Sequence, residues 1–413
     1  MPRITESWEF KTDILTAYDG TEQRICTRKY PRHFLSYDYD AMNQFHSQML
    51  RAQVRVKQDI PYYIPMWQNV AYITEPLTKL SRQIPIDKDY VYDFRDVEYI
   101  ELFVGDTVTG SNRNYVRKVK NVIDNTLYLT RGFPKDLDPK NTFILPLRKC
   151  SVQPIQGLNY VFSNGSGVTL NFEDIGLTTI NKLSQKYYDY DTDIKGWNRY
   201  HLPEKFLEKE VFLFAPVWVE DNDMQLTVNK NTNKLDNKSG IFLYDLKNDF
   251  SYDIISWTIN LMSKKEINRI IKFFKNMRGM QKGFWLPSMV NDIQLPEENL
   301  SSNDVIYTSF YGMTEYYLSN GRQKYIVVFY NDYSCSIAKI KSYSSTKING
   351  IDYCTLKLAT PLNKRPTKEN VHMISYFNYV RFNDDTLQLN YESNIVASVT
   401  CTFREIDDKL EEK

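Results

Sequence analysis

A short motif occurs twice in this chain, and the repeat limits the folds that the chain can adopt. Gly283–Leu295 has the sequence GFWLPSMVNDIQL, and Tyr62–Ile73 has the sequence YYIPMWQNVAYI. Each copy combines bulky aromatic and aliphatic residues with one proline, follows a helix-like segment and continues into a strand-like tail. Because sequence repeats indicate repeated structural units, we predict that the chain contains one unit twice.

The predicted elements follow the same order around both copies: a hairpin, a Ser-Tyr-Asp strand, a helix, the aromatic-proline motif and further strands. Four sequence matches support this order, with members 215, 222, 229 and 219 residues apart. The matches are Ser36 with Ser251, Pro65 with Pro287, Thr126–Leu129 with Thr355–Leu358, and Leu170–Glu173 with Leu389–Glu392. Short insertions produce differences of this size, so the matches favour a duplication over two unrelated β-rich domains.

The second copy of the motif follows the strongest helix pattern in the chain, over Lys264–Met277. Its apolar residues recur at i, i+3, i+4 and i+7, which places them on one face; they are Ile267, Ile270, Ile271 and Phe274. Ser263 and Glu266 form a capping box, and Gly279 stands where a C-terminal glycine belongs. In the first half, Asp40–Arg55 has a weaker helical pattern.

Most other segments show the alternation and the turn residues of short strands. We therefore predict a mainly β fold with a few helices, built as two tandem, duplicated β-barrel or β-sandwich domains that each carry one helix. The first domain covers residues 1–175, a polar linker covers residues 176–210, and the second domain covers residues 211–413.

The composition argues against some classes of partner. A net charge of +1 over 413 residues provides neither a basic excess for phosphates nor a field that favours an anionic membrane. The longest apolar runs, such as Val211–Val219, are shorter than the roughly 20 residues of a membrane span. We expect no membrane partner and no sequence-specific nucleic-acid binding.

Tyrosine is unusually frequent, with 31 residues. Tyrosine favours strands and contact surfaces, because its ring packs while its hydroxyl stays hydrogen-bonded. A biased amino-acid usage, in which Asn, Lys and Ile are also abundant, explains the number equally well. The five cysteines form no Cys-x-x-Cys pair, and no signal peptide is visible, so we expect synthesis in a reducing cytoplasm.

Residues that could carry chemistry do not form recognisable motifs. The histidines are His33, His46, His201 and His372, and none stands in a catalytic or zinc-binding pattern. The acidic run Asp87–Glu98 could supply paired carboxylates for glycoside hydrolysis, but an exposed strand edge is the more common origin of such a run. We predict no catalytic residues, no enzymatic activity and no cofactor.

Three acids resemble the start of a calcium-binding loop: Asp189, Asp191 and Asp193. Such a loop needs glycine at its sixth position and an acid at its twelfth, and these positions hold Ile194 and Tyr200. A solvated linker therefore explains the acids better than a metal site, and we predict no bound metal.

Trp8, the run Gly20–Arg24 (GTEQR), the pair Pro31-Arg32 and the strand-like Phe34–Tyr37 follow each other near the N-terminus, and Phe284–Ser288 (FWLPS) comes later after a helix. Together these segments resemble a family of tail proteins from tailed bacteriophages. The GTEQR run is the most specific part of the resemblance. It is missing from the second half, so one of the two copies has diverged.

The resemblance implies a distal-tail or tail-hub protein, which is a structural virion component that joins the tail tube to the tip, spike or fibres. Such subunits close into rings. A duplicated chain then predicts a trimer with pseudo-sixfold symmetry, with a hexamer as the alternative, in contact with other tail proteins of the tube, hub, fibre or spike. The alternative function is carbohydrate binding at the host surface through Trp67, Trp197 or Trp285, and a tail-associated hydrolase is a third hypothesis.

A binding pocket would not be expected to occur after the same helix in both halves. A structural joint, where the chain returns from the helix to the sheet, would occur in each copy of the unit. We therefore interpret the motif as a packing joint. The predicted structural anchors are Trp8, Pro65, Trp67, Trp285 and Pro287. If Trp285 is buried, its replacement by alanine is expected to cost about 3–5 kcal/mol.

Overall fold

The computed structural model describes residues 3–17, 21–41, 43–57, 60–94, 97–105, 112–153, 158–162, 165–175, 199–218, 223–236, 238, 240, 242–309 and 324–407. These residues form mostly antiparallel strands, with helix α1 (Gln44–Lys57) in the first half and helix α3 (Lys264–Met277) in the second. The prediction of a mainly β fold with few helices is therefore confirmed.

The first half contains β1 (Ile4–Glu9), β2 (Thr12–Thr16), β3 (Glu22–Cys26), β4 (Arg32–Ala41), β5 (Tyr62–Pro65), β6 (Ala71–Tyr72), β7 (Gln83–Pro85), β8 (Tyr99–Gly105), β9 (Asn112–Ile123), β10 (Thr126–Leu129), β11 (Thr142–Val152), β12 (Leu158–Phe162) and β13 (Gly165–Asp174). Short 3-10 helices cover Trp67–Asn69, Val91–Phe94 and Pro139–Asn141. The second half contains β14 (Lys205–Phe206), β15 (Lys209–Glu210), β16 (Gln225–Asp236), β17 (Phe242–Leu261), β18 (Phe284–Pro287), β19 (Val305–Thr308), β20 (Tyr325–Tyr330), β21 (Cys335–Ile348), β22 (Ile351–Leu358), β23 (Val371–Phe382), β24 (Thr386–Tyr391) and β25 (Ala397–Glu405).

Eight strands form the central sheet, in the order β16-β17-β25-β24-β1-β4-β13-β12, and every neighbouring pair is antiparallel. Side chains alternate across this sheet, as the two-residue period of a strand requires. In β1, for example, Ile4, Glu6 and Trp8 are buried, whereas the residues between them are partly exposed. The sheet therefore has one buried face and one polar face.

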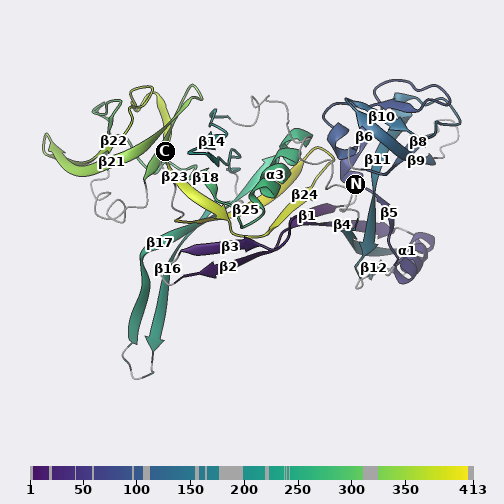
Figure 1. Ribbon diagram of the computed structural model, residues 1–413, viewed down its shortest axis with the longest axis horizontal. Coiled ribbons are helices and arrows are strands. Elements are labelled where there is room, and N and C mark those ends of the chain that lie inside the picture. Colours follow the sequence, from purple (N-terminus) through teal and green to yellow (C-terminus); the bar gives the residue numbers. More distant parts are fainter. Residues whose placement is uncertain are drawn as a thin grey trace.

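The described residues form three hydrophobic cores. The largest, under the central sheet, includes Trp8 and Tyr37 of the first half and Trp257 and Phe274 of the second. A second core lies within residues 71–144, and a third lies within residues 293–376. The two outer subdomains that enclose these smaller cores lie at opposite ends of the molecule in Figure 1. The halves therefore share one core and each adds a subdomain of its own.

The strand pairings of the first half occur again in the second. β4, β13, β11, β5 and β12 pair with one another as β17, β25, β23, β18 and β24 do. The register is also the same, because Pro65 ends β5 opposite Leu147 and Pro287 ends β18 opposite Phe377. These repeated pairings define which residues of the two halves are structurally equivalent.

Two of the four sequence matches join equivalent residues, and two do not. The proline match does, and so does the match of β10 with the last residues of β22, since each pairs with the strand before it. Ser36 lies opposite Asn171, and its equivalent is Ser256, which lies opposite Thr402, so the match with Ser251 is five residues out of register.

The fourth match is also wrong. Leu170–Glu173 lies in β13, which pairs with β4, whereas Leu389–Tyr391 lies in β24, which pairs with β1 and β25. β24 is equivalent to β12, and the matching residues there are Leu158, Asn159 and Tyr160. Both strands therefore have the sequence Leu-Asn-Tyr at the same register, which the sequence comparison missed.

Helix α3 covers the predicted residues, but only half of the predicted capping box forms, because the Glu266 carboxylate accepts a hydrogen bond from the backbone N–H of Met262 rather than that of Ser263. The Ser263 hydroxyl accepts a hydrogen bond from the backbone N–H of Glu266, and Arg278 adopts a left-handed conformation at the C-terminal end. Of the predicted linker, residues 176–198 lie outside the described residues, including Asp189, Asp191 and Asp193. Tyr200 and Leu202, by contrast, are buried in the shared core. This part of the predicted linker is packed structure rather than a free connection.

Candidate functional site: the contact between the two halves

The two halves meet where strand β1 of the first half pairs with strand β24 of the second. Ile4 lies opposite Tyr391 and Glu9 lies opposite Thr386, so all of β1 takes part. Figure 1 shows β1 beside β24 near the middle of the molecule. This pairing makes one continuous sheet from strands that are up to 387 residues apart, as Ile4 and Tyr391 are.

A buried polar network lies beneath this pairing. The imidazole of His33 contacts the Glu6 carboxylate through Nε2 at 2.7 Å and the Asp174 carboxylate through Nδ1 at 3.3 Å. The Tyr391 hydroxyl, from the other half, donates a hydrogen bond to Glu6 Oε2 at 2.6 Å. Burial alone would lower the pKa of His33, but its hydrogen bonds with Asp174 and Glu6 raise this pKa overall.

The pKa of Glu6 shifts in the opposite direction to that of His33. Burial alone would raise the pKa of the Glu6 carboxyl, but the hydrogen bond and charge of His33 lower it overall. Both shifts favour the carboxylate form of Glu6 and the imidazolium form of His33. Removal of one partner from a buried pair leaves an uncompensated charge, which is costly. The network thus ties the register of β1 and β24 to the interior of the first half.

Helix α3 of the second half contributes two lysines to the same contact. Lys275 Nζ lies 3.4 Å from the centre of the Trp8 ring, and the other face of this ring stacks on His33 at 3.9 Å. Lys264 is buried and donates hydrogen bonds to the Gln68 carbonyl at 2.6 Å and to Asn69 Oδ1 at 2.7 Å. Helix α3 is therefore bonded to both β1 and the first aromatic-proline motif.

The hairpin β2–β3 clasps the second half at a different place. It forms a separate two-stranded sheet, and Glu22 at the start of β3 accepts two hydrogen bonds from the Arg381 guanidinium of β23, at 2.8 and 2.9 Å. Both side chains are at most 4% exposed. Burial alone would raise the pKa of Glu22, but Arg381 and Arg404 lower it overall. The glutamate of the GTEQR run therefore helps to attach this hairpin, together with Thr12 of β2, whose backbone N–H and hydroxyl donate hydrogen bonds to the Asp385 carboxylate.

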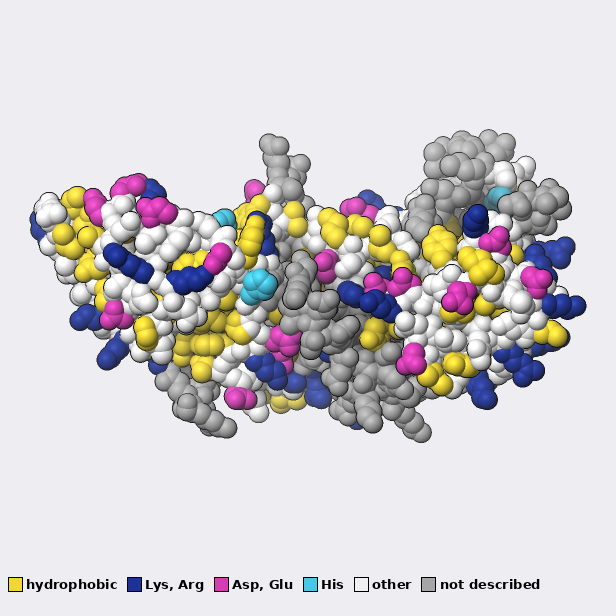
Figure 2. All heavy atoms as spheres, turned by 90° about the horizontal axis from the view of Figure 1, so that it is seen from above, with side chains coloured by type: hydrophobic (Ala, Val, Ile, Leu, Met, Phe, Trp, Pro, Cys, Tyr) yellow, Lys and Arg dark blue, Asp and Glu magenta, His cyan; other side chains and the backbone are white. Residues whose placement is uncertain are grey.

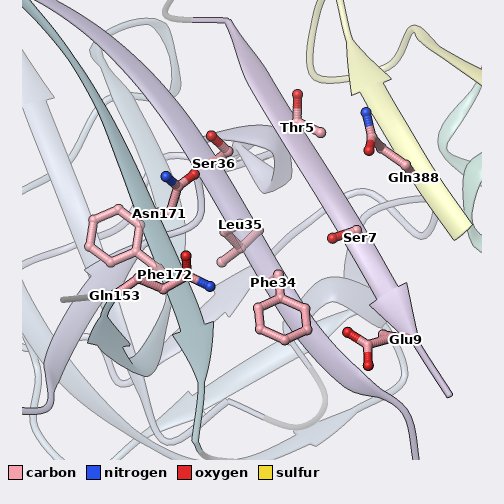
Figure 3. Close-up of a pocket in the computed structure, with 10 residues that line it drawn as sticks. All are labelled: Thr5, Ser7, Glu9, Phe34, Leu35, Ser36, Gln153, Asn171, Phe172 and Gln388. Carbon is pink, nitrogen blue, oxygen red and sulfur yellow. The ribbon is translucent and has the colours of Figure 1, made fainter. Parts of the chain in front are cut away.

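The polar face of the central sheet carries an open groove of about 430 Å³. Figure 3 shows Thr5 and Ser7 of β1, Ser36 of β4 and Gln388 of β24 beside it, with the Phe34 ring at one side. Hydroxyl and amide groups dominate this lining, and Glu9 is its charged member. The groove offers hydrogen bonds over a shallow surface, without a nucleophile held beside a base.

The predicted anchors differ in burial. Trp285 is 2% exposed and lies among Phe206, Phe377 and Tyr379, with its ring stacked on Phe377 at 5.0 Å. Pro287 is buried beside it at the end of β18. This burial excludes Trp285 as a glycan platform in the folded chain.

The remaining anchors lie nearer the contact between the halves. Trp8 is 7% exposed at that contact. Pro65 and Trp67 are only partly buried, and the Trp67 ring lies against Phe103 at 5.4 Å. Pro287 is therefore packed more tightly than its equivalent Pro65. Trp197 lies outside the described residues.

His33, His372 and Asp93, which the sequence offered as possible site residues, are engaged in packing or ion pairs. His33 belongs to the buried network, and the His372 ring stacks on Tyr200 at 5.7 Å. Asp93 of the acidic run pairs with buried Lys264 at 3.2 Å. Within the described part of the chain, no group of three acidic, histidine or cysteine side chains is arranged to hold a metal ion. No described helix is long and apolar enough to cross a membrane.

The most prominent unpaired element is the distal part of β16 and β17, which we name the arm (Lys230–Asp236 with Phe242–Ser251). These residues pair only with each other among the described strands, while β17 joins β25 from Ile254 onward. The arm projects away from the molecule in Figure 1. Its exposed apolar side chains are Leu235, Phe242, Leu243 and Tyr244. Phe242 and Tyr244 lie on one face of the arm, and Leu235 and Leu243 lie on the other. An isolated two-stranded hairpin is marginally stable, and exposed apolar side chains on both faces are typical of a contact surface.

The charged side chains on the face in Figure 2 do not gather into a basic or an acidic patch. Basic and acidic side chains are interspersed over the face in Figure 2, in agreement with the net charge of +1. The sequence matches no known protein family and no curated protein.

Proposed function

We propose that this chain is a structural subunit of a bacteriophage tail, a distal-tail or hub ring component that joins the tail tube to the tip, spike or fibres. The observation that carries the proposal is the repeated unit, whose two copies join edge to edge through β1 and β24 in one continuous sheet. A unit that already joins its own copy is suited to a closed assembly of many copies. The buried residues at that contact serve packing and pairing rather than turnover.

The resemblance of the N-terminal segment to phage tail proteins supports the same proposal. Its most specific run contains Glu22, and this glutamate binds Arg381 of the other half. The run therefore has a role in joining units, which is the role that a ring protein needs. The proposal places the protein in the virion, made in the host cytoplasm, in contact with other tail proteins.

The proposal is tested by the assembly state of the purified chain and by its place in the particle. We expect light scattering and negative-stain images to show rings, with a trimer favoured over a hexamer. Antibody against the chain should label the tail end of intact virions. A chain that stays monomeric at high concentration, or labelling that is absent from the tail, contradicts the proposal.

A carbohydrate-binding role in the same tail is the second candidate, and the groove on the polar face is the observation that favours it. Its hydroxyl and amide groups can bond sugar hydroxyls, and Phe34 can pack against a sugar ring. A glycan array tests this function: binding that is lost in Phe34→Ala but kept in Trp218→Ala supports it. Absence of binding to every host glycan removes it.

A further inference from the structure

We infer that one copy of this chain joins the next through β16 and the arm, which bind β12 and its neighbouring strands in the register of the internal β1–β24 contact. This inference rests on the proposed ring function and identifies the surfaces that the ring uses. The partner is a second copy of the same chain.

The central sheet has two edges that are unpaired among the described strands. One edge is β16 of the second half, and the other is β12 of the first half. β16 is equivalent to β1, because β16 pairs with β17 as β1 pairs with β4. β12 is equivalent to β24, as the Leu-Asn-Tyr register shows. The two unpaired edges are therefore equivalents of the two strands that meet inside the chain.

The register between copies follows from the internal pairs. Thr5 lies opposite Ser36 and its equivalent Gln225 lies opposite Ser256, so residues of β1 correspond to residues 220 positions later. Thr5 also lies opposite Asn390, whose equivalent in β12 is Asn159. Gln225 of one copy is therefore expected opposite Asn159 of the next, in an antiparallel pair.

Exposure agrees with this pairing. Tyr391 is 7% exposed within the chain, whereas its equivalent Tyr160 is 55% exposed. Glu6 is 4% exposed, whereas its equivalent Leu226 is 56% exposed. Apolar side chains that stand at positions of a buried contact, yet are exposed in one copy, are expected to be covered in the assembly.

The arm has a docked counterpart within the chain. Thr12 lies opposite Cys26 in the hairpin β2–β3, and Thr232 lies opposite Leu246 in the arm, again 220 positions later. The hairpin extends from β1 onto the second half, where Glu22 binds Arg381. The arm extends from β16 in the same way, so it is expected to lie on the first half of the next copy.

The docked hairpin β2–β3 and the arm have different side chains at equivalent positions. Phe242 of the arm is equivalent to Glu22 of the hairpin, and Ser151 of β11 is equivalent to Arg381 of β23. The contact between copies therefore lacks this ion pair and has the exposed ring of Phe242 in its place, with Tyr244 on the same face of the arm.

Helix α1 is placed to complete the contact. It is equivalent to α3, whose Lys275 covers Trp8 of the other half. Arg55 is the equivalent of Lys275, and Val228 is the equivalent of Trp8. Arg55 of α1 is exposed, and Val228 of β16 is 60% exposed. If α1 of one copy lies over β16 of its neighbour, as α3 lies over β1, Arg55 covers Val228 as Lys275 covers Trp8.

Such a contact is head-to-tail, because it joins the second half of one copy to the first half of the next. Contacts of this kind generate closed rings when the rotation between units closes. The same geometry then recurs at every junction, alternately within a chain and between chains.

A paired cysteine substitution tests the register. Opposite residues in an antiparallel pair have Cα atoms about 4.5–5.5 Å apart, which is within disulfide range. We expect Gln225→Cys/Asn159→Cys to form covalent oligomers on mild oxidation, ending in a closed ring species. The matched control, Asn229→Cys/Asn159→Cys, is four residues out of register, about 13 Å along a strand, and should give at least tenfold less. A mixture of the two single variants of the first pair should give covalent dimers only.

The results of these experiments distinguish a failure of the proposed β16–β12 contact from a failure of the proposed ring function. Rings in light scattering without this cross-link overturn the β16–β12 contact and leave the ring function standing. Monomers without cross-link overturn both. Equal cross-linking in the control pair overturns the register. As a second measurement, Tyr160→Glu should shift the chain to monomers with an unchanged melting temperature, while Tyr72→Glu, at a similarly exposed tyrosine, should leave the assembly intact.

Discussion

Substitution of Glu22 by glutamine is expected to release the hairpin β2–β3 from the second half. Arg381 is 2% exposed, and its two hydrogen bonds to Glu22 hold the β3 strand of the hairpin there, while Thr12 of β2 bonds Asp385. Breaking a buried ion pair by removing one charge costs about 3–5 kcal/mol. Because the hairpin forms its own two-stranded sheet, most of this loss should affect its local opening rather than global unfolding.

Hydrogen exchange of the backbone amides in residues 12–26 measures this opening. Each 1.4 kcal/mol is a factor of ten in an equilibrium constant, so Glu22→Gln should speed exchange there by about two to three orders of magnitude. Glu98→Gln is the matched control, since its pair with Lys118 is 51% exposed on both sides and exposed pairs contribute at most about 1 kcal/mol.

A double variant separates charge from shape. Glu22→Gln with Arg381→Met removes both charges, so it should recover part of the protection that Glu22→Gln loses. Unchanged exchange in residues 12–26 of Glu22→Gln would show that the ion pair does not hold the hairpin, and the reasoning would fail. The lowered pKa of Glu22 adds a pH test. Its contribution is present above pH 4.5 and should be lost as pH falls through that lowered pKa.

Three further predictions concern stability. Trp285→Ala should lower the free energy of unfolding in urea by about 3–5 kcal/mol, while Trp218→Ala, at a 62% exposed side chain, should stay within about 0.5 kcal/mol; equal effects would contradict the anchor role. The raised pKa of His33 contributes stability that is complete below pH 6.5 and is lost as pH rises through the raised value, so His33→Gln should flatten this part of the stability profile. Gly132→Ala should destabilise by about 1–3 kcal/mol in the same urea assay, because its Cβ would meet the Leu80 backbone; wild-type stability would show that the loop can move.

Local patterns predicted the parts of the fold that local physics determines. The periodicity of Ile267, Ile270 and Phe274 predicted α3, because a helical face and its caps lie within a few residues of one another. The proline motif predicted equivalent joints in the two halves, and the structure places the ends of the equivalent strands β5 and β18 at Pro65 and Pro287. These features depend on neighbours in the sequence, so a single sequence is enough to find them.

The contact between the halves could not be predicted in the same way. Glu22 was visible in the GTEQR run, but its partner Arg381 lies 359 residues away and belongs to no motif. The Leu-Asn-Tyr match was missed because Leu170-Asn171-Phe172 is almost as similar to Leu389–Tyr391. The signal that could have identified the correct match was the tyrosine, because Tyr160 is identical to Tyr391 whereas Phe172 is not. Pairing between distant strands depends on register, which tripeptides do not specify.

The covalent connection between the two halves affects how an assembly of these chains would form. β1 and β24 meet within one molecule, so every second junction of the proposed ring would form without a collision between separate partners. Each avoided association spares a loss of translational and rotational freedom worth about 4–15 kcal/mol. Assembly from whole chains would therefore need half as many bimolecular encounters as assembly from separate single units. It also forces the two diverged units to alternate, so a ring could not place two identical units side by side.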